Sequence, residues 1–104
     1  MRTRWFGATG VRVPEIAVEG EDLSVLDERR VELGDKAFES LIVEGAIEKE
    51  ALRAAHARGL PVIARARTAT EVRDALAHPE VACALVPPGR RELRELDLTA
   101  LTYG

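Results

Sequence analysis

The feature that most constrains the fold is a set of short, almost uninterrupted apolar runs in the second part of the chain. Residues 41–44, 61–66 and 81–86 form three such runs about twenty residues apart, and residues 98–103 form a fourth at a shorter spacing. Runs of this length without polar alternation are typical of strands that are buried on both faces, as in a parallel sheet. The sequence therefore predicts parallel strands at these four places.

Helical patterns occupy the gaps between the runs. Residues 46–58 carry apolar side chains at helical spacing, and Gly59 and Pro61 then follow as helix-ending signals. We expect the inward face of this helix to be formed by Ile47, Ala51, Ala54, Ala55 and Arg58.

A second helix begins at a capping box, in which the Thr68 hydroxyl accepts from a backbone amide while Glu71 reaches back. It is predicted to end before Pro79 and to bury Val72, Ala75 and Leu76, and a third, short helix is predicted over residues 90–96. Strands that alternate with helices through short connections are typical of βαβ units. The predicted fold class is α/β, with a small, mostly parallel sheet over about residues 41–103.

The first part of the chain has a different pattern. Residues 11–18 alternate around Pro14, which predicts a strand, and because proline cannot donate to a ladder this strand should lie at an edge or carry a bulge. Short extended segments are predicted near residues 23–25 and 31–33. We therefore expect an antiparallel β segment over about residues 1–35, within a single domain that spans residues 1–104.

Composition excludes several classes of protein. The formal net charge of −3 argues against a nucleic-acid-binding domain that works through bulk positive charge. No apolar run approaches the roughly 18 residues that a membrane span needs. The single cysteine, Cys83, excludes a disulfide framework and multi-cysteine zinc sites. We expect a cytoplasmic protein with no metal, no cofactor, and no nucleic-acid or membrane partner.

A candidate ligand site follows from the predicted topology, because ligands of open parallel sheets bind beyond the carboxyl ends of the strands. Helix N-termini attract anions there, and arginine adds bidentate hydrogen bonds. The alternative is that Thr68 only caps its helix and that the arginines form a solvated face. The predicted anion-binding residues are Arg65, Arg67, Thr68, Gly89, Arg90 and Arg91, with the acidic Glu44 at the same rim.

Residues 41–45, which end in Glu44 and Gly45 before a predicted helix, resemble the first strand of topoisomerase-primase (Toprim) domains. In that family the glutamate serves nucleotidyl transfer or hydrolysis, and an Asp-x-Asp pair at the end of a later strand holds magnesium. The matching place here, residues 85–90, carries no carboxylate, so this chain lacks the magnesium clamp. We therefore expect Glu44 to pair with a nearby arginine instead.

The remaining reactive side chains give no catalytic arrangement. His56 is expected at the solvent boundary of its helix and His78 in the last turn of the next, neither at metal-ligand spacing. Cys83 lies within an apolar run, where cysteine usually behaves as a small hydrophobic residue. Whether the protein is an enzyme is left open.

Three functions remain. We expect an interaction or oligomerisation module, most simply a homo-oligomer, in which the N-terminal segment with Trp5 and Phe6 covers a sheet edge in the same chain or pairs with another. One alternative is a binder of, or enzyme on, a phosphorylated or carboxylated small molecule at the strand-end rim. The other is a partial β/α barrel that a partner completes.

Overall fold

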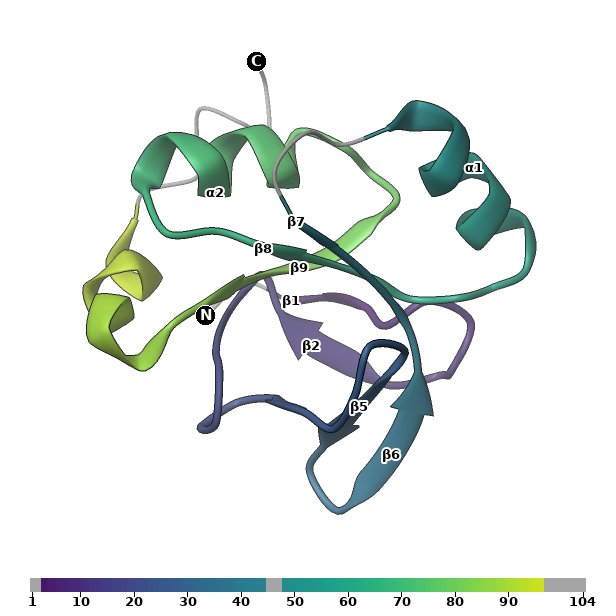
Figure 1. The fold of residues 1–104 in the computed structure, drawn as a ribbon, viewed down its shortest axis with the longest axis horizontal. Coiled ribbons are helices and arrows are strands. Elements are labelled where there is room, and N and C mark those ends of the chain that lie inside the picture. Colours follow the sequence, from purple (N-terminus) through teal and green to yellow (C-terminus); the bar gives the residue numbers. More distant parts are fainter. Residues whose placement is uncertain (1–2, 45–47, 97–104) are drawn as a thin grey trace.

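A four-stranded parallel sheet forms the middle layer of the molecule (Figure 1). In this computed structural model, which describes residues 3–44 and 48–96, the spatial order of its strands is β3 (Ile16–Val18), β9 (Val81–Val86), β8 (Val62–Arg65) and β7 (Leu41–Glu44). Each neighbouring pair runs parallel. The predicted α/β class with a mostly parallel sheet is therefore confirmed, while the predicted strand over residues 98–103 lies outside the described residues.

Strand β3 comes from the part of the chain that we expected to be wholly antiparallel. The chain bends at Glu15, so the predicted strand around Pro14 is divided in two. Strand β2 (Arg12–Pro14) pairs antiparallel with β1 (Thr3–Trp5), whereas β3 lies parallel to β9. The Glu15 carbonyl accepts from the Ala84 amide at 2.8 Å, which starts the parallel ladder.

A second antiparallel sheet consists of β4 (Ser24–Val25), β5 (Arg30–Leu33) and β6 (Lys36–Glu39). The antiparallel structure thus extends to Glu39, beyond the predicted limit at residue 35. The β5–β6 turn contains Gly34, whose φ of 68° is readily adopted only by glycine. The chain then passes through Ser40 directly from β6 into β7.

Helices α1 (Lys49–Ala57) and α2 (Ala69–Leu76) cover one face of the parallel sheet, and the antiparallel strands cover the other (Figure 1). The buried side chains of α2 are Val72, Ala75 and Leu76, as predicted. In α1 the predicted face is partly wrong. Its buried residues are Leu52 and Ala55, while Ala54 and Arg58 are exposed and Ile47 lies outside the described residues. The largest apolar side chain of the helix, Leu52, determines which face turns inward.

The third helix is a 3₁₀ helix, η1 (Pro88–Glu95), with non-helical dihedral angles at Arg90. It buries Leu93 and packs against β3. Within residues 3–44 and 48–96, no helix combines the length and apolar character that crossing a bilayer requires.

The core is divided between the two faces of the parallel sheet. Val62 and Ala64 pack toward the helices, whereas Ile63 packs toward the antiparallel strands. All six residues of β9 are buried, because both faces of this central strand are covered. On the antiparallel side, the rings of Phe6 and Phe38 meet edge to face with their centroids 5.4 Å apart. Two-sided burial is the physical reason for the continuous apolar runs in the sequence.

Candidate functional site

The carboxyl ends of the parallel strands meet at one rim, where the predicted arginines lie beside carboxylates of this chain. The Arg65 guanidinium donates to Glu19, which follows β3, with Nη1 and Oε1 2.6 Å apart. Arg67 Nη2 lies 3.5 Å from Glu44 Oε1. The expectation that Glu44 pairs with an arginine is therefore confirmed.

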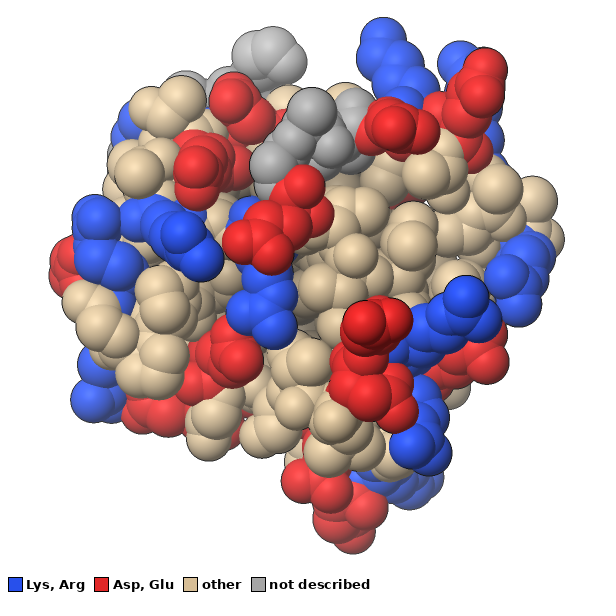
Figure 2. Space-filling model, in the orientation of Figure 1, with Lys and Arg blue, Asp and Glu red and all other residues tan. Residues whose placement is uncertain are grey.

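The two arginines after β9 also have carboxylate partners. Arg91 Nη2 lies 2.5 Å from Glu21 Oε1, and Arg90 Nε lies 2.6 Å from Glu92 Oε1. The hydrogen bond from Arg90 holds the pKa of the Glu92 carboxyl below its usual value. Positive and negative side chains are accordingly mixed on the face that Figure 2 shows. An anion at this rim would have to compete with the carboxylates already bound there.

The helix start beside this rim is also occupied by the chain's own side chains. Thr68 Oγ1 accepts from the Glu71 amide at 3.1 Å, which confirms the predicted N-cap. The Glu71 carboxylate accepts from the Arg67 amide at 2.8 Å, one residue before the amide that a capping box would use. Gly89 is exposed in η1, where the following amide of Arg90 donates to Pro87. Anion binding at these residues stays a prediction.

The two histidines and the cysteine lie apart from one another in the structure. His56 is exposed on α1, as expected, but His78 lies beyond the end of α2 rather than in its last turn. Cys83 is fully buried, and desolvation raises the pKa of its thiol to about 12, so that it packs as a small apolar group. In the part of the chain that the structure describes, no group of three or more His, Cys, Asp or Glu residues could hold a metal ion.

The two edges of the parallel sheet differ in whether other parts of the chain cover their outward backbone groups. At the β3 edge, the Val18 amide donates to the Asp22 carboxylate at 2.9 Å, and η1 packs against the strand. Arg94 Nη1 in turn lies 3.3 Å from Asp22 Oδ2. This edge is therefore closed by side chains and by a helix, which prevents further strand pairing.

The β7 edge has no such cover among the described residues. The Leu41 amide donates to the Pro61 carbonyl at 2.9 Å, so its backbone faces β8. Backbone groups alternate in direction along a strand, which turns the amides of Ile42 and Glu44 away from the sheet. No described strand pairs with β7 on that side. The side chains of Leu41, Ile42 and Val43 are only half-buried, and Glu44 at the end of the strand is exposed. Figure 2 shows an uncharged area in the middle of this face, bordered by acidic and basic side chains.

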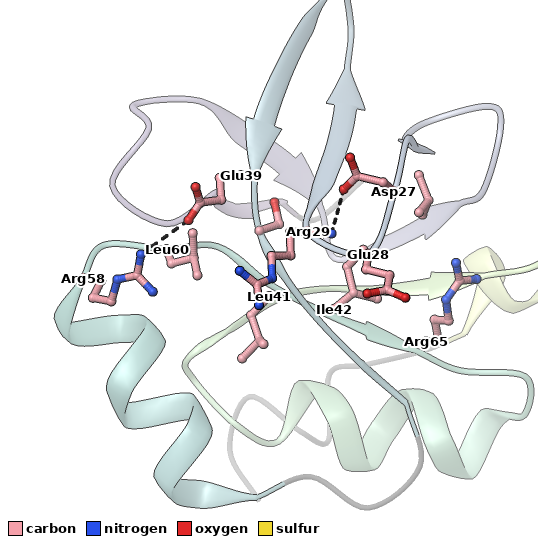
Figure 3. A pocket seen from close by; sticks show the side chains of 11 residues that line it. Asp27, Glu28, Arg29, Glu39, Leu41, Ile42, Arg58, Leu60 and Arg65 are labelled. Atoms are coloured by element: carbon pink, nitrogen blue, oxygen red, sulfur yellow. Dashed lines mark hydrogen bonds and ion pairs between the residues drawn. The ribbon is translucent and has the colours of Figure 1, made fainter.

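A cavity of about 880 Å³ runs along this same edge (Figure 3). Its walls come from the β4–β5 turn, the connection between β6 and β7, the end of α1 and the end of β8. The lining residues are Val25, Asp27, Glu28, Arg29, Glu39, Ser40, Leu41, Ile42, Arg58, Leu60 and Arg65.

Most of the charged groups around the cavity are paired. Arg58 Nη2 lies 3.4 Å from Glu39 Oε1, and Arg65 is held by Glu19. A hydrogen bond from the Arg29 amide, assisted by the Arg30 guanidinium, holds the pKa of Asp27 below its usual value. The Arg29 guanidinium itself has no carboxylate or hydrogen-bond partner among the described residues. It lies in the middle of the cavity in Figure 3, with Arg58 to one side and Arg65 to the other.

Ser40 supplies a second unpaired group. The residue is 2% exposed, and its Oγ has no hydrogen-bond partner among the described residues. The Ser40 amide is satisfied, because it donates to the Arg29 carbonyl at 2.7 Å. Leaving a buried hydroxyl without a partner costs about 1–3 kcal/mol. The sequence does not predict this cavity, and the one local feature near it is Ser40, which stands directly before an apolar run.

No protein-family model matches the sequence, and no curated protein or solved structure is significantly similar to the chain.

Proposed function

We propose that this protein is an association module in which the β7 edge pairs with the β7 strand of a second copy. The observation that carries the proposal is the contrast between the two edges of one sheet. The β3 edge is closed by Asp22 and η1, whereas no described residue pairs with the outward amides of β7. An unpaired edge with apolar side chains is a template for strand addition.

A second copy of the same strand suits this edge. Leu41, Ile42 and Val43 are apolar and half-buried, so an antiparallel pair of β7 strands brings apolar side chains together on both faces. The outward backbone groups of Ile42 and Glu44 supply hydrogen bonds to the partner strand. Pairing about a two-fold axis closes the assembly, as in most homodimers.

The other functions receive less support from the geometry. The rim arginines are paired with carboxylates, which weakens the case for an anion at the strand ends. Completion of a β/α barrel would need one face of the sheet to line a barrel interior. Here the helices cover one face and the antiparallel strands cover the other (Figure 1).

Sedimentation-velocity measurements over a range of protein concentrations test the proposal. The wild-type chain is expected to populate a dimer that strengthens with concentration. Val43→Lys places two lysines near each other across the paired strands, and like charges there oppose association. The matched control is Val43→Thr, which keeps the β-branched shape and adds no charge. We expect dimers from the control and monomers from Val43→Lys.

The far-ultraviolet circular dichroism spectrum checks that both variants are folded. A wild-type chain that remains monomeric at high concentration would overturn the proposal. A dimer that survives in folded Val43→Lys would show that association uses another surface.

A further inference from the structure

We propose that the cavity beside β7 binds a small molecule with one carboxylate and an apolar body, in which Arg29 pairs with the carboxylate and Ser40 donates a hydrogen bond to it. This inference goes beyond the proposed association, because it assigns a ligand site to the cavity itself. It is carried by the unpaired guanidinium of Arg29 and the unpaired hydroxyl of Ser40, both of which line the cavity. The Glu28 carboxylate is a third lining group without a partner among the described residues.

Arg29 differs from the other two arginines of the cavity. Arg58 and Arg65 each lie within ion-pair distance of a glutamate, whereas Arg29 has no such partner in the described part of the chain. Figure 3 shows its guanidinium between those of Arg58 and Arg65. The planar guanidinium presents parallel N–H groups that match a carboxylate in a bidentate pair.

Ser40 supplies the second contact. The Ser40 amide donates to the Arg29 carbonyl at 2.7 Å, and this backbone hydrogen bond holds the two residues side by side just beyond the β5–β6 hairpin. Rotation about the Cα–Cβ bond moves the hydroxyl between staggered positions. A ligand carboxylate that accepts from this hydroxyl would relieve the cost of leaving it unpaired.

The charged and apolar residues that line the cavity indicate which class of ligand it suits. Asp27, Glu28 and Glu39 also line the cavity, and their negative charges disfavour a doubly charged phosphate more than a single carboxylate. Val25, Ile42 and Leu60 provide an apolar wall for the rest of the molecule. A volume of about 880 Å³ is large enough for a small organic ligand.

Octanoate is a suitable probe, because it combines one carboxylate with an apolar chain. Titration calorimetry and amide chemical shifts are measured with the wild-type protein, with 1-octanol as the uncharged comparison. We expect saturable binding of octanoate, shifts centred on residues 25–29 and 40–42, and clearly weaker binding of 1-octanol.

Arg29→Gln removes the charge that pairs with the carboxylate. It is expected to weaken octanoate binding about tenfold or more, since hydrogen bonds to charged groups contribute strongly. The matched control is Arg73→Gln, which makes the same charge change at an exposed position on α2. This control is expected to bind octanoate as the wild type does.

Ser40→Ala distinguishes an effect on octanoate binding from an effect on stability. Removal of an unpaired buried hydroxyl should leave the melting temperature of the free protein unchanged or raise it. The same substitution should weaken octanoate binding severalfold. A serine with only a structural role would not change the affinity for octanoate.

The proposal is overturned if octanoate gives no saturable shifts, if the shifts lie on another face, or if Arg29→Gln binds like Arg73→Gln. Sedimentation of the same samples reports the oligomeric state separately. A monomer that binds octanoate at Arg29 would disprove the association through β7 and support the ligand site, whereas a dimer without octanoate binding would do the reverse.

Discussion

At the scale of single residues, Arg4 connects parts of the chain that lie far apart in the sequence. Its Nη2 donates to the Leu76 carbonyl at 2.7 Å, and its Nη1 donates to the carbonyls of Val81 and His78 at 2.9 and 3.3 Å. Its Nε also lies 3.2 Å from the buried Glu15 carboxylate. One guanidinium thus ties the β1–β2 hairpin to the connection between α2 and β9.

Arg4→Met keeps much of the side-chain bulk but removes every one of these donors. Because three buried or half-buried backbone carbonyls then lose a charged donor and one ion pair to Glu15 is removed, we expect the free energy of unfolding to fall by about 2–4 kcal/mol. The control is Arg12→Met on the neighbouring strand, where an exposed guanidinium bonds to Thr3 and stacks over Trp5. It should cost less than about 1 kcal/mol. Urea unfolding measures both, and equal losses would contradict the role of Arg4.

The candidate site shows what a sequence reveals at this scale. The pairing of Glu44 with an arginine was predictable, because both follow strands whose ends meet at one rim. The cavity was not predictable. Arg29 and Ser40 are adjacent only because the β5–β6 hairpin folds back on itself. No local pattern marks Arg29, and the position of Ser40 before an apolar run does not by itself indicate a cavity.

At the scale of elements, the start of α2 is the best-defined helix signal in the chain. The Thr68 hydroxyl accepts from the Glu71 amide, so Thr68→Ala leaves that amide without its cap and should lower the free energy of unfolding by about 1 kcal/mol. Thr70→Ala is the control, because Thr70 is exposed inside the same first turn and alanine favours helix formation there. Thermal or urea unfolding compares the two. A loss as large for Thr70→Ala would contradict the capping role.

The elements that sequence predicted well are those with a local pattern. The apolar runs of β7, β8 and β9 and the face of α2 follow directly from spacing. Strand β3 has only three residues, and its partner β9 lies far along the chain, with Ile16 opposite Ala84. Strand β6 carries exposed and charged residues, so its pairing depends on the Gly34 turn rather than on hydrophobic alternation. The pairing of β3 and β6 therefore depends on contacts that the local sequence pattern does not reveal.

At the scale of the whole molecule, the two-sided cover of the parallel sheet fixes the environment of Cys83. This residue lies in the central strand, fully buried, and its thiol pKa is raised from 9.0 to about 12 mainly by desolvation. The folded protein therefore holds the thiol proton more tightly than the unfolded chain does. The resulting stabilisation is complete below pH 9 and is lost as the pH rises toward 12, because the unfolded state ionises first.

The comparison of the wild type with Cys83→Ala tests this linkage. The variant lacks the thiol and has a smaller side chain, so its free energy of unfolding is lower by a constant amount at neutral pH. Between pH 8 and pH 10, however, the wild type should lose about 1 kcal/mol more than the variant does, because one pKa unit corresponds to about 1.4 kcal/mol. Urea unfolding at each pH gives both curves, and between pH 6 and pH 8 they should run parallel. Curves that stay parallel up to pH 10 would mean that the thiol ionises as easily in the folded protein as in the unfolded chain, and thus that water reaches the centre of the sheet.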